Sequence, residues 1–151
     1  MITEKIEHYW RQFASATGLT GVKYFDVSEY GDSKKKSDEL AALIASGVKT
    51  ANSSAVGLYE PDEVVPKVGD YNIILDGSGS PVCVTKTELV ETVPFNQVSA
   101  EHAYHDGEGD RSLKSWRKAH INFFQHEYAE EGRQFNEQVP CLCEIFKVVY
   151  K

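Results

Sequence analysis

Two strand-like segments joined by a turn-forming pentapeptide constrain the fold of this chain more than any other feature. Tyr71–Leu75 and Val82–Leu89 are rich in β-branched residues, and the connection between them, Asp76-Gly-Ser-Gly-Ser80, is rich in residues that accept positive φ. A connection this short joins neighbouring strands in the antiparallel sense only. The sequence therefore predicts an antiparallel hairpin as part of a larger sheet.

Two other segments predict further strands of that sheet. Val139–Tyr150 is β-branched and apolar on both faces, a pattern typical of a central barrel strand. Thr50–Tyr59 consists mainly of small residues that tolerate an extended backbone. Together with the hairpin, these segments predict an antiparallel sheet or a small barrel.

Three segments have the apolar periodicity of amphipathic helices. They are residues 3–17, which Thr3 is expected to cap, the stretch from Ser37 to Gly47, and Ser112–Glu130. Gly31–Ser37 is polar and predicts a linker before the second helix. Helices combined with this sheet predict the α+β class.

Length and composition predict one folded domain. A chain of 151 residues can bury enough surface to build a core, so we expect a single domain over residues 1–151, with residues 1–36 as a helical extension. The content of 41% hydrophobic and 26% charged residues is typical of globular proteins. Because no apolar run approaches the ~20 residues of a membrane helix and the N-terminal residues lack the apolar stretch of a signal peptide, we expect a cytoplasmic protein without a membrane partner.

Charge and cysteine content narrow the classes of partner. The net charge of 16 minus 23, or −7, disfavours duplex DNA as a partner, because electrostatic binding to a duplex needs clustered lysine and arginine side chains. A small ligand or a short single strand of RNA is compatible with that charge. The cysteines are odd in number and predict buried reduced thiols rather than a disulfide or a metal site: Cys83, Cys141 and Cys143.

The segment Gly47–Ser54 carries more polar chemistry than a scaffold requires. Lys49 follows a helix-ending glycine and precedes a run of short hydrogen-bonding side chains. One interpretation is a lysine that reaches inward toward a site. The other is an ordinary solvated lysine near a helix C-terminus, where its charge is mildly favoured.

A second polar segment, Glu101–Arg111, contains two histidines, several carboxylates and two glycines. Such residues can supply a general acid or base, and they can also form a solvated acidic loop before a helix. A calcium loop of the EF-hand type is excluded, because counting from Asp106 puts Arg117 where the bidentate glutamate should stand. His102 and His105 lack a second ligand pair nearby, so we predict neither a metal nor another cofactor.

Several short motifs follow one another in a fixed order along the chain. They are Asp38-Glu-Leu-Ala-Ala-Leu-Ile44, Gly47-Val-Lys-Thr50, Tyr59-Glu60, Pro66-Lys-Val-Gly-Asp-Tyr71, Asp76-Gly-Ser-Gly79, Gly107-Glu-Gly-Asp-Arg-Ser-Leu113 and Trp116-Arg117. This series resembles the ASCH domain family over about residues 24 to 150. Membership implies a mostly antiparallel β-barrel of the PUA-like type with flanking helices, and a cleft suited to RNA or nucleosides.

The family signature is a glycine, a lysine two residues later and a threonine three residues after that. Gly47 and Lys49 match, whereas Asn52 stands at the threonine position and Ser54 stands where an arginine often follows. Some small members resemble amidohydrolases that remove the acetyl group from the exocyclic amine of cytidine with the lysine, the threonine and a downstream glutamate. The resemblance therefore implies catalytic positions at Lys49, Asn52 and Glu108.

These residues suit amide hydrolysis in part. Lys49 can act as a base if burial favours its neutral amine, and Glu108 can deliver a proton to the departing amine. Asn52 has no hydroxyl to deprotonate, although its amide can donate a hydrogen bond to an oxyanion. Thr50 and Ser54 share the strand face of Asn52 and are candidate substitute hydroxyls, as is a water molecule.

Two other functions stay open beside the hydrolase. In a non-catalytic module that binds RNA or a nucleotide, an aromatic ring stacks on a base and basic side chains hold phosphate. In a metal-independent ribonuclease, lysine and arginine side chains would stabilise the negative charge of the reacting phosphate, but the sequence shows no well-placed histidine pair. Trp116 also fits the simpler interpretation of a buried helix face. The candidate substrate-binding residues are Thr50, Ser54, Tyr59, Arg111, Trp116 and Arg117.

Overall fold

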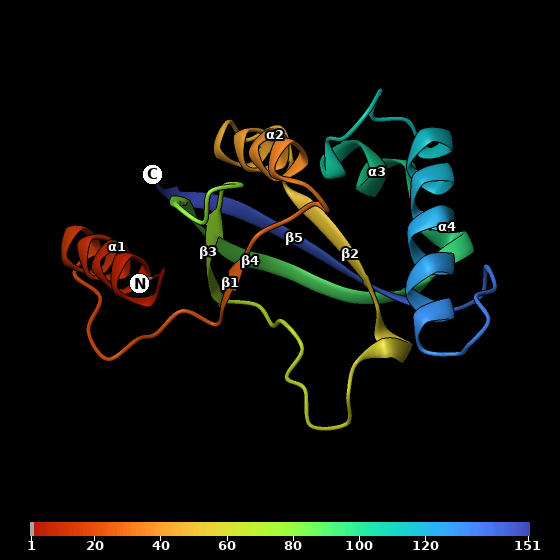
Figure 1. Cartoon of the computed structure of the whole chain (residues 1–151), viewed down its shortest axis with the longest axis horizontal. Helices are drawn as coiled ribbons and strands as arrows, with labels where there is room; N and C mark the ends of the chain where they lie inside the picture. Colours follow the sequence, from red (N-terminus) through yellow and green to blue (C-terminus); the bar gives the residue numbers. More distant parts are fainter. Residues whose placement is uncertain (1) are drawn as a thin grey trace. The chain divides into compact units, whose positions relative to one another are not determined.

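A mixed sheet is the centre of the fold, in a computed structural model that describes residues 2–151, with side chains from residue 4 onward. Within that range five strands hydrogen-bond in the order β1-β3-β4-β5-β2, the order of a half-barrel, and Figure 1 labels them. β1 and β3 are parallel, whereas the pairs β3–β4 and β2–β5 are antiparallel. The predicted α+β class is thereby confirmed. The strands are β1 (Asp26–Ser28), β2 (Ala51–Ala55), β3 (Tyr71–Leu75), β4 (Pro81–Pro94) and β5 (Pro140–Tyr150); the helices are α1 (Ile2–Thr17), α2 (Lys34–Ala45), α3 (Ala100–Asp106) and α4 (Leu113–Glu130), with 3₁₀ turns η1 (Val56–Leu58) and η2 (Phe95–Gln97).

The described chain divides into two compact units, through both of which β4 and β5 pass. The first comprises Met1–Val48, Val68–Glu88 and Phe146–Lys151, and the second comprises Lys49–Lys67 and Leu89–Ile145.

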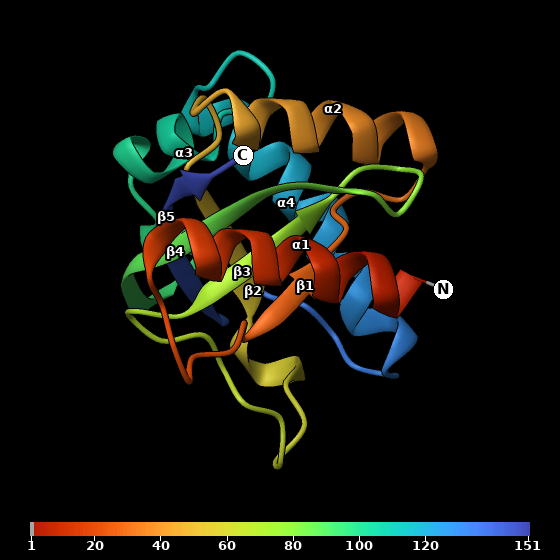
Figure 2. The same ribbon diagram turned by 90° about the vertical axis from the view of Figure 1, so that its left-hand side faces the viewer.

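In the first unit, helices cover both faces of the hairpin. Side chains alternate across a strand, so Ile73 and Ile74 point to opposite faces of β3. Ile73 packs with Phe13 and the other apolar residues of α1, which Figure 2 shows in red across β1 and β3. Ile74 packs with Ile44 of α2. The predicted hairpin is confirmed, because Tyr71 to Leu75 pair in antiparallel register with β4.

In the second unit, β2 and β5 pair antiparallel, with Ala51 opposite Ile145 and Ala55 opposite Cys141. Ala55 and Cys141 face a core to which α4 contributes large apolar side chains. Figure 1 shows α3 and α4 beside each other at this core. The aromatic members of the cluster are Phe95, Trp116, Phe124 and Tyr128.

One predicted boundary was wrong because of a helix cap. Ser33 accepts a hydrogen bond from the Lys36 amide at 3.1 Å and starts α2 at Lys34, so the second half of the predicted linker is helical. α3 was not predicted as a helix, and a loop was one of the interpretations of its segment; Ser99 caps it through the His102 amide at 3.0 Å. α1 begins before Thr3, whose side chain is outside the described residues.

The cysteines are free and buried, as the sequence predicted. In the part of the chain from residue 2 onward, no group of three histidine, cysteine, aspartate or glutamate residues is arranged to hold a metal ion. Over the same described residues, no helix has the length and apolar character to cross a membrane.

Candidate functional site

Lys49 is a buried lysine whose ammonium lies among oxygen atoms. The residue is 1% exposed, and its Nζ donates to the Ala51 carbonyl at 2.9 Å, to Asp106 Oδ1 at 3.0 Å and to Glu108 Oε2 at 3.1 Å. The Asp106 carbonyl is a further acceptor at 3.3 Å. Of the two interpretations of the sequence, the inward-reaching lysine is the one present.

The C-terminal end of α3 positions both carboxylates. Gly107 ends the helix with a positive φ of 78°, and Gly109 follows with a φ of 62°. These left-handed residues reverse the chain, so that Asp106 and Glu108 both approach the lysine. The Thr50 amide donates to the His105 carbonyl at 2.7 Å and ties the segment after Lys49 to the same helix.

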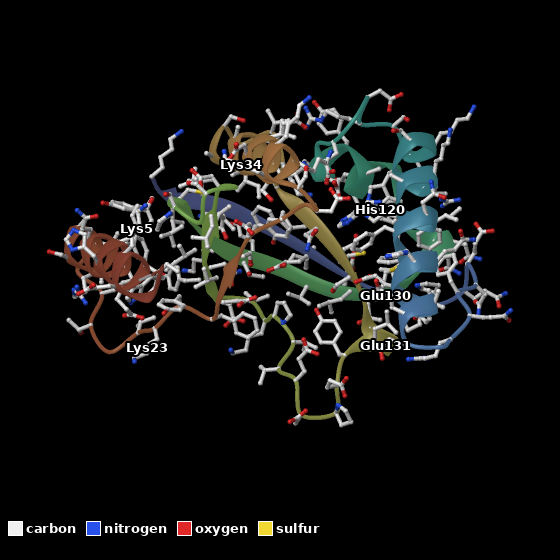
Figure 3. All side chains as sticks on the ribbon, viewed as in Figure 1. Lys5, Lys23, Lys34, His120, Glu130 and Glu131 are labelled. Carbon is white, nitrogen blue, oxygen red and sulfur yellow. The ribbon has the colours of Figure 1, made fainter. Side chains whose placement is uncertain are left out.

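Asp106 connects the lysine to α4. Its side chain is 2% exposed, and Oδ2 accepts a hydrogen bond from Trp116 Nε1 at 3.2 Å. His120 Nε2 lies 3.9 Å from the same oxygen, and its ring stacks on Trp116 with centroids 4.1 Å apart. Figure 3 shows His120 projecting from the side of α4 that faces α3. Burial lowers the pKa of His120.

Glu108 is the solvent-facing member of this group. Its side chain is 33% exposed, against 1% for Lys49 and 2% for Asp106. Burial raises the pKa of Glu108 above the ordinary value of 4.5, the Lys49 ammonium opposes that rise, and the neighbouring Asp106 adds to it. A carboxyl group with these properties can exchange protons with a bound molecule.

Asn52 and Ser54 lie on the opposite face of β2 from Ser53. Asn52 is half-buried and stands directly across from Glu144 of β5, which is 6% exposed. Ser54 Oγ lies 2.9 Å from the Tyr59 hydroxyl. The predicted residues of β2 therefore share a face with each other, with Tyr59 close to Ser54.

Two predicted ligand-binding residues make contacts that support the fold. Trp116 is 5% exposed and stacks between Phe95 and His120, so it offers no ring face to a base. Arg117 donates through one guanidinium nitrogen to the carbonyls of Asn96 and Val98 at 2.9 and 3.3 Å. This arginine holds the η2 turn against α4.

Arg111 has a strained backbone conformation and lies three residues after Glu108. Its φ of 65° lies in the left-handed region, which non-glycine residues rarely occupy. The guanidinium carbon lies 3.7 Å from the centre of the Tyr104 ring, and Nε donates to the Tyr104 carbonyl at 2.9 Å. Stacking on Tyr104 is the contact that defines the place of this side chain.

Three buried polar residues of this unit were not chosen as site residues from the sequence: Asp106 and His102, which belong to the polar segment Glu101–Arg111, and Glu144. Ser53 Oγ lies 2.8 Å from His102 Nε2, and burial, with the Lys49 charge, lowers the His102 pKa to about 4. Asp106 belongs to the polar segment Glu101–Arg111, but no sequence pattern distinguishes it from the other carboxylates there. Glu144 could have been noticed in the sequence, because it is the one acidic residue in the mainly apolar strand β5.

Comparison with known proteins adds three findings. A family model described as "ASCH domain" matches residues 26–150. The crystal structure of an ASCH domain from Lactobacillus crispatus JV V101 is 31% identical, with a TM-score of 0.91 over 98% of this chain and 96% of the other. Protein EF3133 from Enterococcus faecalis V583 is 34% identical, with a TM-score of 0.88 over 98% and 94% of the two chains.

A more distant structure shares the fold alone. The hypothetical protein PH0355 is 15% identical, with a TM-score of 0.54 over 82% of this chain and 97% of the other. No curated protein matches this chain.

Proposed function

Because this chain belongs to the ASCH domain family, we propose that it acts on acylated nucleosides and hydrolyses their exocyclic amide bond beside Lys49 and Glu108. The observation that carries the proposal is the contact of 3.1 Å between the buried Lys49 ammonium and the Glu108 carboxylate. These two side chains come from distant parts of the sequence, and amide hydrolysis needs both a proton-transfer group and a group that stabilises the oxyanion, which a positive charge can do.

Glu108 is the proton-transfer group in this proposal. Its carboxylate accepts a proton as water attacks the acyl carbon, which creates a tetrahedral intermediate. It then passes that proton to the departing amine nitrogen as the carbon–nitrogen bond breaks. The products are a carboxylic acid and a nucleoside with a free amino group. Because Glu108 is partly exposed, it can meet a bound substrate, which Asp106 cannot.

Lys49 supplies charge in the present arrangement. Its ammonium donates to four oxygen atoms, two of them on carboxylates. To serve as the base, the lysine would have to lose a proton and weaken both carboxylate contacts. We therefore assign it to hold Glu108 in place and to offset negative charge that develops on the substrate.

The attacking group is water or a hydroxyl on β2 or next to it. Asn52 cannot be deprotonated for attack, so its role is to donate or accept hydrogen bonds. Thr50 and Ser54 are the nearby hydroxyls in the sequence, and Ser54 is already engaged with Tyr59. A water molecule activated by Glu108 requires neither of them.

The pH dependence of turnover is expected to follow the ionisation of the Glu108 carboxyl group. Since its pKa is raised above 4.5, the proton-accepting carboxylate disappears as pH falls through that raised value, and kcat/KM should fall there. Asp106→Asn removes one influence that raises this pKa, so the acidic limb should move to lower pH. A pH series of kcat/KM for both proteins measures the shift. If the acidic limb of the kcat/KM profile is unchanged in Asp106→Asn, the limb belongs to a group other than Glu108.

Asn52 favours a second function, a non-catalytic module that binds a nucleoside or single-stranded RNA. A screen of acetylated cytidine and short single-stranded RNA separates these functions. Release of cytidine supports the hydrolase, RNA cleavage supports a ribonuclease, and binding without turnover supports the module.

Duplex DNA is expected to bind weakly, with a shallow dependence on salt, because the net charge is −7. Titration of a labelled duplex at several salt concentrations checks this. Sub-micromolar affinity with a slope corresponding to roughly six or more phosphate contacts would contradict it.

A further inference from the structure

His120 of α4 directs its imidazole ring at the carboxylates that surround Lys49, and the mechanism above does not use it. Its Nε2 lies 3.9 Å from Asp106 Oδ2. The ring stacks on Trp116, with an angle of 18° between the two planes. The side chain is 16% exposed, against 2% for Asp106, so protons from the solvent can reach the histidine more easily than the aspartate.

A backbone carbonyl fixes the tautomer of the neutral His120 ring. Nδ1 lies 2.9 Å from the Trp116 carbonyl oxygen. Because a carbonyl oxygen can only accept a hydrogen bond, Nδ1 carries the proton of the neutral ring, and Nε2 has a bare lone pair. The gap of 3.9 Å between Nε2 and Asp106 Oδ2 is longer than a hydrogen bond, as expected when neither atom carries a proton. A proton on Nε2 turns these two groups into an ion pair.

The site has an excess of negative charge while His120 is neutral. Lys49 contributes one positive charge, and the carboxylates of Asp106 and Glu108, at 3.0 and 3.1 Å from its Nζ, contribute one negative charge each. One additional proton therefore makes the group electrically neutral. Two places can accept that proton, Nε2 of His120 and a carboxylate oxygen of Glu108. Ionisable groups that interact in this way titrate as a coupled pair.

The groups that face His120 act on its charge in opposite directions. Burial is the largest influence and lowers the pKa of the ring; the Trp116 carbonyl and the Glu108 charge raise it, and the Lys49 ammonium lowers it. Burial also lowers the pKa of His102 of α3 to about 4, so this second histidine is uncharged at neutral pH. His120 is consequently neutral at neutral pH, and an ionised Glu108 helps it to take up a proton as the pH falls.

We propose that His120 is a positioning residue of the site: by taking up a proton at Nε2 beside Asp106, it keeps the Glu108 carboxyl group ionised as the medium becomes more acidic. An imidazolium at this place adds a positive charge to the group and so favours the carboxylate form of Glu108. The coupling is reciprocal, since the Glu108 charge favours the imidazolium by the same free energy. The inference rests on the proposed function only for its effect on turnover.

NMR of the ¹⁵N-labelled chain can follow the tautomer and the titration of His120. In the wild type at neutral pH, Nδ1 should carry the proton and Nε2 should be bare. Glu108→Gln should lower the pKa of His120, because it removes a negative charge that favours the imidazolium. His126 of the same helix is 76% exposed and pairs with Glu130, so its titration should stay the same and serves as an internal reference. Glu101→Gln, which changes a carboxylate of α3 that is 85% exposed, should leave the titration of His120 unchanged.

His120→Phe tests the effect on turnover. Phenylalanine keeps a ring that can stack on Trp116, but it cannot take up a proton. At neutral pH, kcat/KM for acetylated cytidine should stay close to the wild-type value, because His120 is neutral there. The acidic limb of the kcat/KM profile should move to higher pH, since no imidazolium remains to favour the Glu108 carboxylate. A ring needed only for packing would instead lower kcat/KM at every pH and leave the limb in place.

The outcomes keep this inference apart from the proposed hydrolase. A His120 pKa that falls in Glu108→Gln, in a chain that does not hydrolyse acetylated cytidine, supports the coupling and removes the hydrolase. Hydrolysis together with a His120 titration that is the same in the wild type and in Glu108→Gln keeps the hydrolase and overturns the inference. A wild-type ring with its proton on Nε2, or an acidic limb that does not move in a folded His120→Phe protein, overturns it as well. The NMR measurements decide the question if His120→Phe does not fold.

Discussion

Lys49→Met is expected to lower the free energy of unfolding by about 3–5 kcal/mol. The substitution keeps the length of the side chain and removes the charge that pairs with Asp106, whose side chain is 2% exposed. A buried carboxylate that loses its ion partner retains its full desolvation penalty. Chemical denaturation followed by circular dichroism measures the change, and an unaltered slope would show that the unfolded state is the same.

Two control variants separate burial from charge. Lys34 also makes an ion pair at 3.0 Å, with Asp38, but its side chain is 69% exposed, so Lys34→Met should leave stability unchanged within error. In the double variant Lys49→Met with Asp106→Leu the buried charge pair is replaced by apolar groups, and a large part of the lost stability should return. A loss below about 1 kcal/mol in Lys49→Met would mean that the Asp106 charge is relieved in another way.

Glu108→Gln is expected to lower the turnover of acetylated cytidine by about 10²–10⁴-fold while the fold is retained. Glutamine preserves the shape and can still accept a hydrogen bond from Lys49, but it cannot take up the proton of the attacking water. Steady-state assays of cytidine release measure the effect. A Glu108→Gln protein with wild-type turnover would remove Glu108 from the mechanism.

Lys49→Arg complements that experiment, because arginine keeps its charge and does not act as a base at neutral pH. If Lys49 supplies charge, Lys49→Arg should retain more turnover than Lys49→Ala. If both are equally inactive although folded, the assignment of Lys49 as the base gains support.

Asn52→Thr distinguishes a hydrolase from a binding module. In a hydrolase that uses water, the change should alter the rate without being essential. In a module that only binds, the wild type should be inactive, and a hydroxyl restored at the threonine position of the family signature is expected to create weak turnover. If the wild type, Lys49→Ala, Glu108→Gln and Asn52→Thr are all folded and equally inactive, the hydrolase proposal is wrong and the binding module replaces it.

Local pattern was sufficient for most of the secondary structure. The hairpin around Asp76–Ser80 and the C-terminal strand were predictable, because turn residues and β-branched runs act over a few neighbouring positions. The start of α2 and the whole of α3 were not, since each depends on a serine cap that outweighs a weak apolar pattern. Lys49 and Glu108 could be named from the order of short motifs, but not their contact.

The sequence by itself determined most of the elements and the segments that carry reactive side chains. Only the tertiary structure decided what surrounds each side chain, and that decided its chemistry. Trp116 and Arg117 support the fold through a carboxylate and through carbonyls that they meet only after folding. Asp106 gained its importance in the same way, through burial next to Lys49, a partner 57 positions away. Burial and cross-strand pairing arise from contacts between distant residues, which no local pattern of the chain encodes.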